Sequence, residues 1–201
     1  IRPMCFYGSE GMGLRADNLK VHTMVAAWEW PSYMEPEARE NGIKVKVSSF
    51  KRQVRNPVSS AKINGNYVHS IVALNEALES GFDEALMLDA EDNVAEGSGE
   101  NFFIVKNGEV WTSTGEYCLP GITRGNIIKL CRENHIPVFE KNFQMKDIYS
   151  ADEVFVTGTF AGVIPAVQVD DTTIGNGNCG LITGGLYHLY KSNIATLYPR
   201  E

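Results

Sequence analysis

The sequence reads KINGNYVHS at residues 62–70 and AEGSGENFF at residues 95–103, and the rest of the chain is interpreted outward from these two stretches. The first places Lys62 in a polar, glycine-containing loop before a segment of helical periodicity, which Gly81 ends. The second places Glu96 and Glu100 around two glycines, directly before an apolar strand. Both stretches therefore place ionisable side chains in the loops between regular elements.

Hydrophobic periodicity predicts the elements on either side of these stretches. The turn Asn107-Gly108 between two apolar runs is a strong hairpin signal. Strands and helices alternate without a regular repeat, which predicts an α+β fold. Strands are expected at residues 4–7, 20–27, 43–49, 84–89, 101–106, 109–112, 137–140 and 153–157, and helices at 67–80, 125–133 and 181–197.

Composition narrows the possible functions of the 201 residues. A hydrophobic content of 43% with 21% charged residues is typical of globular proteins, and a net charge of −7 disfavours nucleic acid and anionic membranes as partners. No apolar run is long enough to span a bilayer. The four cysteines are far apart and lack metal-ligand spacing, so no metal site is expected and a reducing, cytoplasmic location is favoured. Because the chain opens with Ile1 in an apolar run, we expect it to be part of something longer.

Two of the candidate residues have both a chemical and a structural interpretation. A partly desolvated lysine in the position of Lys62 can act as a Schiff-base nucleophile, although most loop lysines are simply solvated. Glu96, beside glycines that allow a flat ligand to approach, can hold a protonated ring nitrogen, or it can decorate a surface turn. Glu100 is the weaker candidate of the two carboxylates, since a hydrogen bond to nearby backbone would also explain it.

Two further segments are suited to binding an anion. LPGITRG at residues 119–125 opens a helix, whose free N–H groups and the Thr123 hydroxyl can bind a phosphate or can merely form an N-terminal cap. The small-residue loop TGTFAG at residues 157–162 follows a strand and offers further N–H groups. A lysine, a carboxylate and two anion-binding loops are the parts that a pyridoxal 5′-phosphate (PLP) site requires.

Four strings in this order, KINGNYVHS, AEGSGENFF, LPGITRG and VTGTFAG, resemble the branched-chain aminotransferase family of fold-type IV, D-amino acid aminotransferase-like enzymes. The opening residues IRP, FYGSEGMG and WEWPSYM are similar to that family as well, so the resemblance covers nearly the whole chain.

The resemblance implies a role for each matching residue. Lys62 would form the Schiff base and then move a proton as the catalytic amine, while Glu96 would pair with the pyridinium nitrogen. Tyr67 would hydrogen-bond near the phenolic oxygen of the cofactor, and Leu119 would pack on its ring. The phosphate would be bound by Ile122, Thr123 and Thr159. Substrate contacts would come from Arg2, Trp30, Tyr33, Thr159 and Phe160.

The same resemblance implies the organisation of the chain. Residues 1–31 would be a remnant of the family's small N-terminal domain, residues 32–40 a linker and residues 41–201 the large PLP-binding domain. The reaction implied is ping-pong transamination of Leu, Ile and Val with 2-oxoglutarate, in a homodimer or higher homo-oligomer.

Several alternatives stay open. Phe160 and Gly162 depart from the residues usual in branched-chain enzymes, so an R-selective amine or D-amino acid transaminase of the same fold is the first alternative. The others are a catalytically incomplete PLP-binding fragment and, more remotely, a lyase that uses the same lysine.

Overall fold

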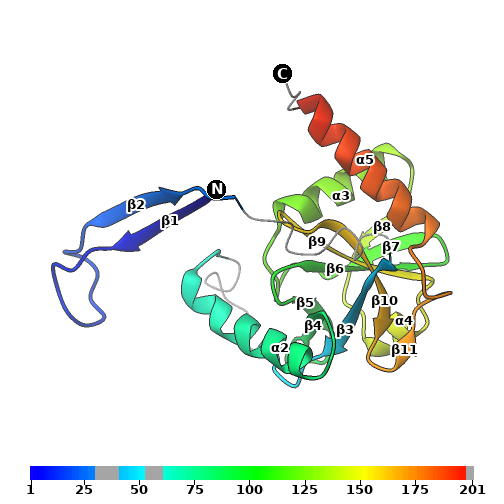
Figure 1. Ribbon diagram of the computed structural model, residues 1–201, viewed down its shortest axis with the longest axis horizontal. Helices are drawn as coiled ribbons and strands as arrows, with labels where there is room; N and C mark the ends of the chain where they lie inside the picture. The colour runs from blue at the N-terminus through cyan, green and yellow to red at the C-terminus, as the bar shows by residue number, and fades with distance from the viewer. Residues whose placement is uncertain (30–40, 53–60, 198–201) are drawn as a thin grey trace. The chain divides into compact units, whose positions relative to one another are not determined.

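The computed structural model describes residues 1–29, 41–52 and 61–197 (Figure 1). Contacts between Cα atoms divide the chain into two compact units, Ile1–Tyr33 and Met34–Glu201. The predicted linker, residues 32–40, lies outside the described residues, and the domain boundaries proposed from the sequence stay a prediction.

The first unit is a two-stranded antiparallel ribbon formed by β1 (Arg2–Tyr7) and β2 (Val21–Ala26). Both expected strands are present. Most residues of the ribbon are exposed on both faces, so it has no hydrophobic core of its own.

The second unit is built on one nine-stranded mixed sheet. The neighbouring strands follow the order β5-β4-β3-β10-β9-β6-β7-β8, and β11 pairs with β10. Parallel pairing joins β3 to β4, β3 to β10, and β7 to β8, and the other pairs are antiparallel. The strands are β3 (Ile43–Val47), β4 (Glu84–Leu88), β5 (Val94–Gly97), β6 (Asn101–Lys106), β7 (Glu109–Thr112), β8 (Val138–Glu140), β9 (Glu153–Gly158), β10 (Gly162–Val169) and β11 (Thr172–Thr173).

Helices cover this sheet in two places (Figure 1). Helix α2 packs on β4, where Ala73 and Ala77 meet Ala85 and Met87 in a small apolar cluster. Helices α3 and α5 pack together over β9 and β10. The helical elements are η1 (Asn64–Asn66), α2 (Tyr67–Glu79), α3 (Ile122–Glu133), α4 (Met145–Tyr149) and α5 (Leu181–Leu197).

Strand β6 is buried on both faces because its alternate side chains belong to two different cores. Phe102 and Ile104 lie in the cluster on one face of the sheet, together with residues of β3, β4 and β9. Phe103 and Val105 lie in the cluster beneath α3 and α5, where Phe103 stacks on Phe155 at 4.8 Å between ring centroids. This central position holds the start of β6, at Asn101, in a fixed place.

The mixed sheet with its helices confirms the α+β prediction, and the expected bounds of β6, β7 and α5 match the structure. Strands β5, β10 and β11 and helix α4 have no counterpart among the expected elements. Helix α3 begins at Ile122, three residues before the expected start, because Gly121 already occupies its N-cap. Among the described residues, no helix is long and apolar enough to cross a membrane.

Candidate active site

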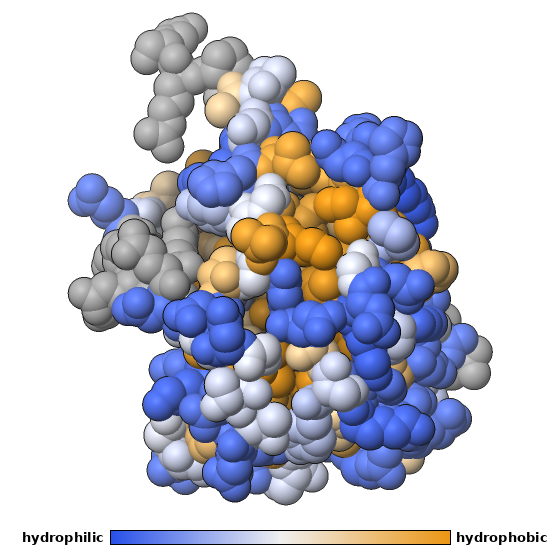
Figure 2. Space-filling model, turned by 90° about the vertical axis from the view of Figure 1, so that its right-hand side faces the viewer, coloured by the Kyte–Doolittle hydropathy of each residue, from blue (hydrophilic) through white to orange (hydrophobic). Residues whose placement is uncertain are grey.

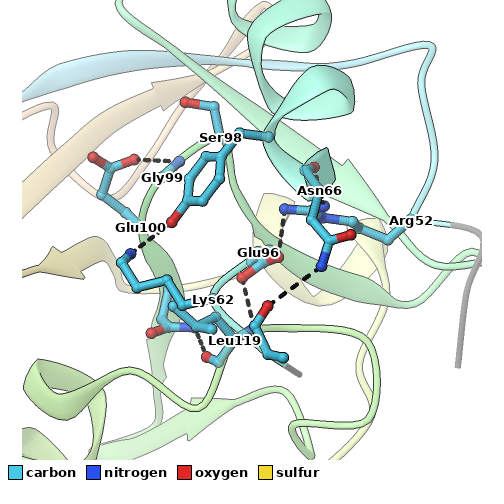
Figure 3. Close-up of a pocket in the computed structure, with 11 residues that line it drawn as sticks. Arg52, Lys62, Asn66, Glu96, Ser98, Gly99, Glu100 and Leu119 are labelled. Carbon is cyan, nitrogen blue, oxygen red and sulfur yellow. Dashed lines mark hydrogen bonds and ion pairs between the residues drawn. The ribbon is translucent and has the colours of Figure 1, made fainter. Parts of the chain in front are cut away.

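A pocket opens where the loop before α2, the β5–β6 turn and the segment before α3 meet (Figure 3). Four residues to which the resemblance gives a cofactor role line it: Lys62, Tyr67, Glu96 and Leu119. The structure thus brings together side chains from three segments that are distant in the sequence. The other lining residues are Arg52, Ala61, Asn66, Ser98, Gly99, Glu100 and Asn101.

Lys62 faces Tyr67 across the mouth of this pocket. The Lys62 Nζ donates a hydrogen bond of 2.6 Å to the Tyr67 Oη, and five residues of sequence separate the two. Tyr67 is the first residue of α2, so its phenol is anchored to a regular element, whereas Lys62 comes from the loop before η1. Lys62 is exposed, as the solvated interpretation of this loop lysine has it, and not partly desolvated.

Glu96 is the buried charge of the pocket. It lies on β5, which pairs with β4 at Met87, and both of its carboxylate oxygens have partners. Oε1 is 2.7 Å from the Arg52 Nη2, and Oε2 accepts a hydrogen bond of 2.9 Å from the Leu119 N–H. Burial raises the pKa of Glu96, and the Arg52 guanidinium and the Leu119 N–H oppose that rise.

The segment before α3 is tied to the same pocket by Asn101. The Asn101 Nδ2 donates a hydrogen bond of 2.8 Å to the Leu119 carbonyl. A Cβ atom at Gly121 would collide with the Asn101 Oδ1, so the close approach of this segment requires glycine at position 121. Leu119 therefore presents its N–H to Glu96 from a backbone that β6 itself positions.

The predicted phosphate ligands do not line the pocket. Ile122 and Thr123 form the first turn of α3 after the N-cap Gly121, and the buried Thr123 hydroxyl is 3.5 Å from the Tyr190 hydroxyl. Thr159 and Phe160 lie exposed in the turn between β9 and β10. Both segments border the start of β6. The α3 segment does so at Gly121, which lies against Asn101. The β9 segment does so at Gly158, where an added Cβ would lie 3.4 Å from the Glu100 Cγ. Their assignment to the phosphate stays a prediction.

Besides Thr159 and Phe160, the predicted substrate residues are Arg2, Trp30 and Tyr33, and none of these three belongs to the described part of the second unit. Arg2 begins β1 of the first unit, opposite Ala26. Trp30 and Tyr33 are not among the described residues. The substrate contacts therefore stay predictions for all three.

Arg52 is the site residue that sequence reasoning missed. Besides Glu96, its guanidinium donates to the Ser70 hydroxyl at 3.0 Å and to the Asn66 carbonyl at 3.4 Å. It thus links Glu96 to the start of α2. Arg52 follows the expected strand 43–49 by three residues, and nothing local in the sequence identifies a partner 44 positions away.

The exposed Lys62 amine and the buried Glu96 carboxylate line the same pocket. Gly99 is exposed, and a Cβ built there would have nothing within 4 Å, so open space adjoins the pocket at this residue. The amine can react with an aldehyde, and the carboxylate can hold a protonated ring nitrogen. These residues fit the PLP predicted from the sequence.

Comparisons with known proteins agree with this geometry. A family model described as amino-transferase class IV matches residues 1–169. The branched-chain-amino-acid aminotransferase of Pseudomonas aeruginosa is 51% identical over 191 residues, which cover 94% of this chain and 62% of the relative. The chain spans about 60% of the length of the curated relatives it matches.

Solved structures show the same fold. The branched-chain amino acid aminotransferase of Escherichia coli has a TM-score of 0.91 at 37% identity, covering 94% of this chain and 64% of that one. The corresponding enzyme of Thermobaculum terrenum, solved in its PLP form, has a TM-score of 0.82 at 28% identity, covering 96% and 63%. These likenesses confirm the fold-type IV architecture.

Proposed function

The chain belongs to the amino-transferase class IV family, and from that premise we propose that it forms the PLP-binding part of an enzyme that transaminates branched-chain amino acids. The observation that carries the proposal is the pairing of Lys62 with the clamped Glu96 in one pocket. The substrate class is supported by the names of relatives in Pseudomonas aeruginosa and Escherichia coli. The amino acceptor we propose is 2-oxoglutarate.

When bound, PLP supplies an electron sink for the charge that develops on the substrate Cα as its proton leaves. Lys62 holds the cofactor through its amine and afterwards moves the proton between the substrate Cα and the cofactor C4′. Tyr67 keeps the lysine amine in place through its hydroxyl, 2.6 Å away.

Glu96 holds the proton on the ring nitrogen. A carboxylate that burial makes more basic is suited to this task, and Arg52 and the Leu119 N–H keep it oriented and favour its ionised form. The N–H groups of Ile122 and Thr123 at the start of α3, together with Thr159, would bind the phosphate. Arg2, Trp30, Tyr33 and Phe160 would contact the substrate.

The proposal is tested by an absorbance titration of the chain with PLP, followed by L-leucine. We expect a visible band that needs Lys62, because only a covalent bond to the lysine changes the chromophore. The band should persist in the control Lys129→Ala, which removes an exposed lysine on α3, and be absent in Lys62→Ala. Any transamination should fall at least about 100-fold in Lys62→Ala.

The amino donor that removes the absorbance band distinguishes the branched-chain enzyme from its alternatives. Loss of the band with L-leucine and not with D-leucine supports the L-branched-chain enzyme, and the reverse supports a D-amino acid transaminase. A band that an R-amine removes and neither leucine enantiomer changes supports the R-selective amine transaminase. A band that none of these donors changes indicates a PLP-binding part without activity. A band of equal strength in Lys62→Ala would contradict the proposed lysine.

A further inference from the structure

Two buried carboxyl groups meet beneath the turn that joins β5 to β6, and the proposed reaction uses neither. Glu84, on β4, is fully buried, and Glu100 is 8% exposed. The Glu84 Oε1 accepts hydrogen bonds from the Ala85 N–H at 2.7 Å and the Ser98 N–H at 3.0 Å. The Glu84 Oε2 is buried and, within the described part of the chain, has no donor.

Glu100 lies next to Glu84 beneath the same turn, close enough for the two carboxyl groups to share a proton. Its own Oε2 accepts a hydrogen bond of 3.1 Å from the Gly99 N–H. The charged groups near Glu100 are Glu84 on β4 and Glu96 on β5, both acidic. The cations of the pocket, Arg52 and Lys62, act on Glu96.

Two adjacent buried carboxylates repel each other where, as among the described residues here, no cation pairs with both, and one proton removes the repulsion. We propose that Glu100 is protonated at neutral pH and donates its O–H to the Glu84 Oε2, and that this neutral acid positions the turn carrying Glu96. We place the proton on Glu100 because the Glu84 Oε1 already accepts two backbone N–H groups, whereas the Glu100 carboxyl group accepts one, from Gly99. Burial and the neighbouring Glu84 raise the pKa of Glu100 to about 9.

The packing around Glu100 explains why its charge matters to the site. The Gly97 N–H donates to the Glu100 carbonyl at 2.7 Å, which closes the turn. An added Cβ would lie 3.2 Å from the Glu100 carbonyl oxygen at Gly97 and 3.4 Å from the Glu100 Cγ at Gly158. Glu100 thus lies between the strand that carries Glu96 and the residue before Thr159. Its ionisation would add a negative charge beside the phosphate loop, a consequence that rests on the proposed function.

The protonation of Glu100 at neutral pH is tested first by the pH dependence of unfolding in denaturant. A group that is protonated in the folded chain up to about pH 9 and titrates near 4.5 when unfolded stabilises the fold at low pH, and that stability is lost as the pH rises through this interval. The unfolding constant of the wild type, divided by that of Glu100→Gln, should rise about tenfold per pH unit between about pH 5 and about pH 9. The exposed control Glu79→Gln should give a ratio that does not change with pH. A flat ratio for Glu100→Gln would overturn the shared proton.

Infrared spectroscopy on the wild type provides a measurement that does not depend on a variant that folds. We expect the C=O band of a protonated carboxylic acid at pH 7, which disappears as the pH passes about 9. The absence of such a band at pH 7 would refute the proposal.

The positioning role is tested with pyridoxamine 5′-phosphate, which binds without reacting with Lys62. Affinity should be lost between pH 7.5 and pH 10 in the wild type and retained in Glu100→Gln, because the amide keeps its donor at every pH. Equal loss in both proteins would overturn the positioning role. If neither the wild type nor Glu100→Gln binds pyridoxamine 5′-phosphate at pH 7.5, both the positioning role of Glu100 and the proposed function fail. The infrared band then still decides whether Glu100 is protonated.

Discussion

Arg52 is the side chain that holds Glu96 in place. It contacts the carboxylate at 2.7 Å and at the same time binds Ser70 and Asn66 at the start of α2. Both members of the pair are largely removed from water, with 19% of the Arg52 side chain and 8% of the Glu96 side chain exposed. A buried pair of this kind stabilises a fold little compared with apolar residues, but losing one partner is costly.

Replacing Arg52 with Gln should therefore destabilise the chain by about 3 kcal/mol, because Glu96 is left buried without its counter-charge. The measurement is the free energy of unfolding in urea. The double variant Arg52→Gln, Glu96→Gln should recover part of the loss, since no charge then remains unpaired. If the double variant loses the sum of the two single effects, the residues are not coupled.

At the scale of elements, the site depends on the contact between the start of β6 and the segment before α3. The Asn101 side chain lies against Gly121, where no Cβ is in its way, and it donates a hydrogen bond to the Leu119 carbonyl. The Leu119 N–H is then directed at Glu96. The hydrogen bonds join residues 18 and 23 positions apart in the sequence. A single glycine thus determines how two elements meet at the buried carboxylate.

Gly121→Ala should weaken PLP binding and destabilise the chain by roughly 1–3 kcal/mol, because the new methyl group displaces Asn101. Urea unfolding and a PLP titration measure the two effects. Gly125→Ala is the matched control on the same helix, since nothing lies within 4 Å of its added Cβ. That control should stabilise the chain by up to about 1 kcal/mol, because alanine favours a helix interior more than glycine does. Equal effects at both positions would contradict the role given to Gly121.

Across the whole molecule, stability is unevenly distributed. All three apolar clusters are formed by residues of the second unit, whereas the first unit is a ribbon with exposed apolar side chains, among them Tyr7, Val21 and Val25. A two-stranded ribbon alone has marginal stability in water. On the face shown in Figure 2, hydrophilic residues surround a main apolar area.

Hydrogen exchange should separate the two units. Amides of β6, which is buried on both faces, should exchange only through global unfolding, and those of β1 and β2 should exchange orders of magnitude faster. Mass spectrometry of peptides from residues 1–29 and 101–106 measures the difference. Equal protection of the two regions would show that the ribbon is stabilised by contacts beyond its own pairing.

The sequence by itself determined the elements whose signals are local. The bounds of β6 and β7 follow from apolar runs on either side of Asn107-Gly108, and α5 from its helical periodicity. The resemblance carried by four ordered motifs also singled out Lys62, Tyr67, Glu96 and Leu119, which the fold gathers in one pocket, while their roles stay predictions. Such features depend on neighbours in the chain, so the sequence alone predicts them.

Only the tertiary structure decided the features that depend on distant partners. Strand β10 contains Pro165, which argues against a central strand, yet pairing with β9 and β3 on its two edges makes it one. Arg52 and Glu84 have no local signal, because their roles arise from Glu96 and from the Ser98 N–H, 44 and 14 positions away. A buried charge is defined by what surrounds it, and those surroundings exist only after the sheet has formed.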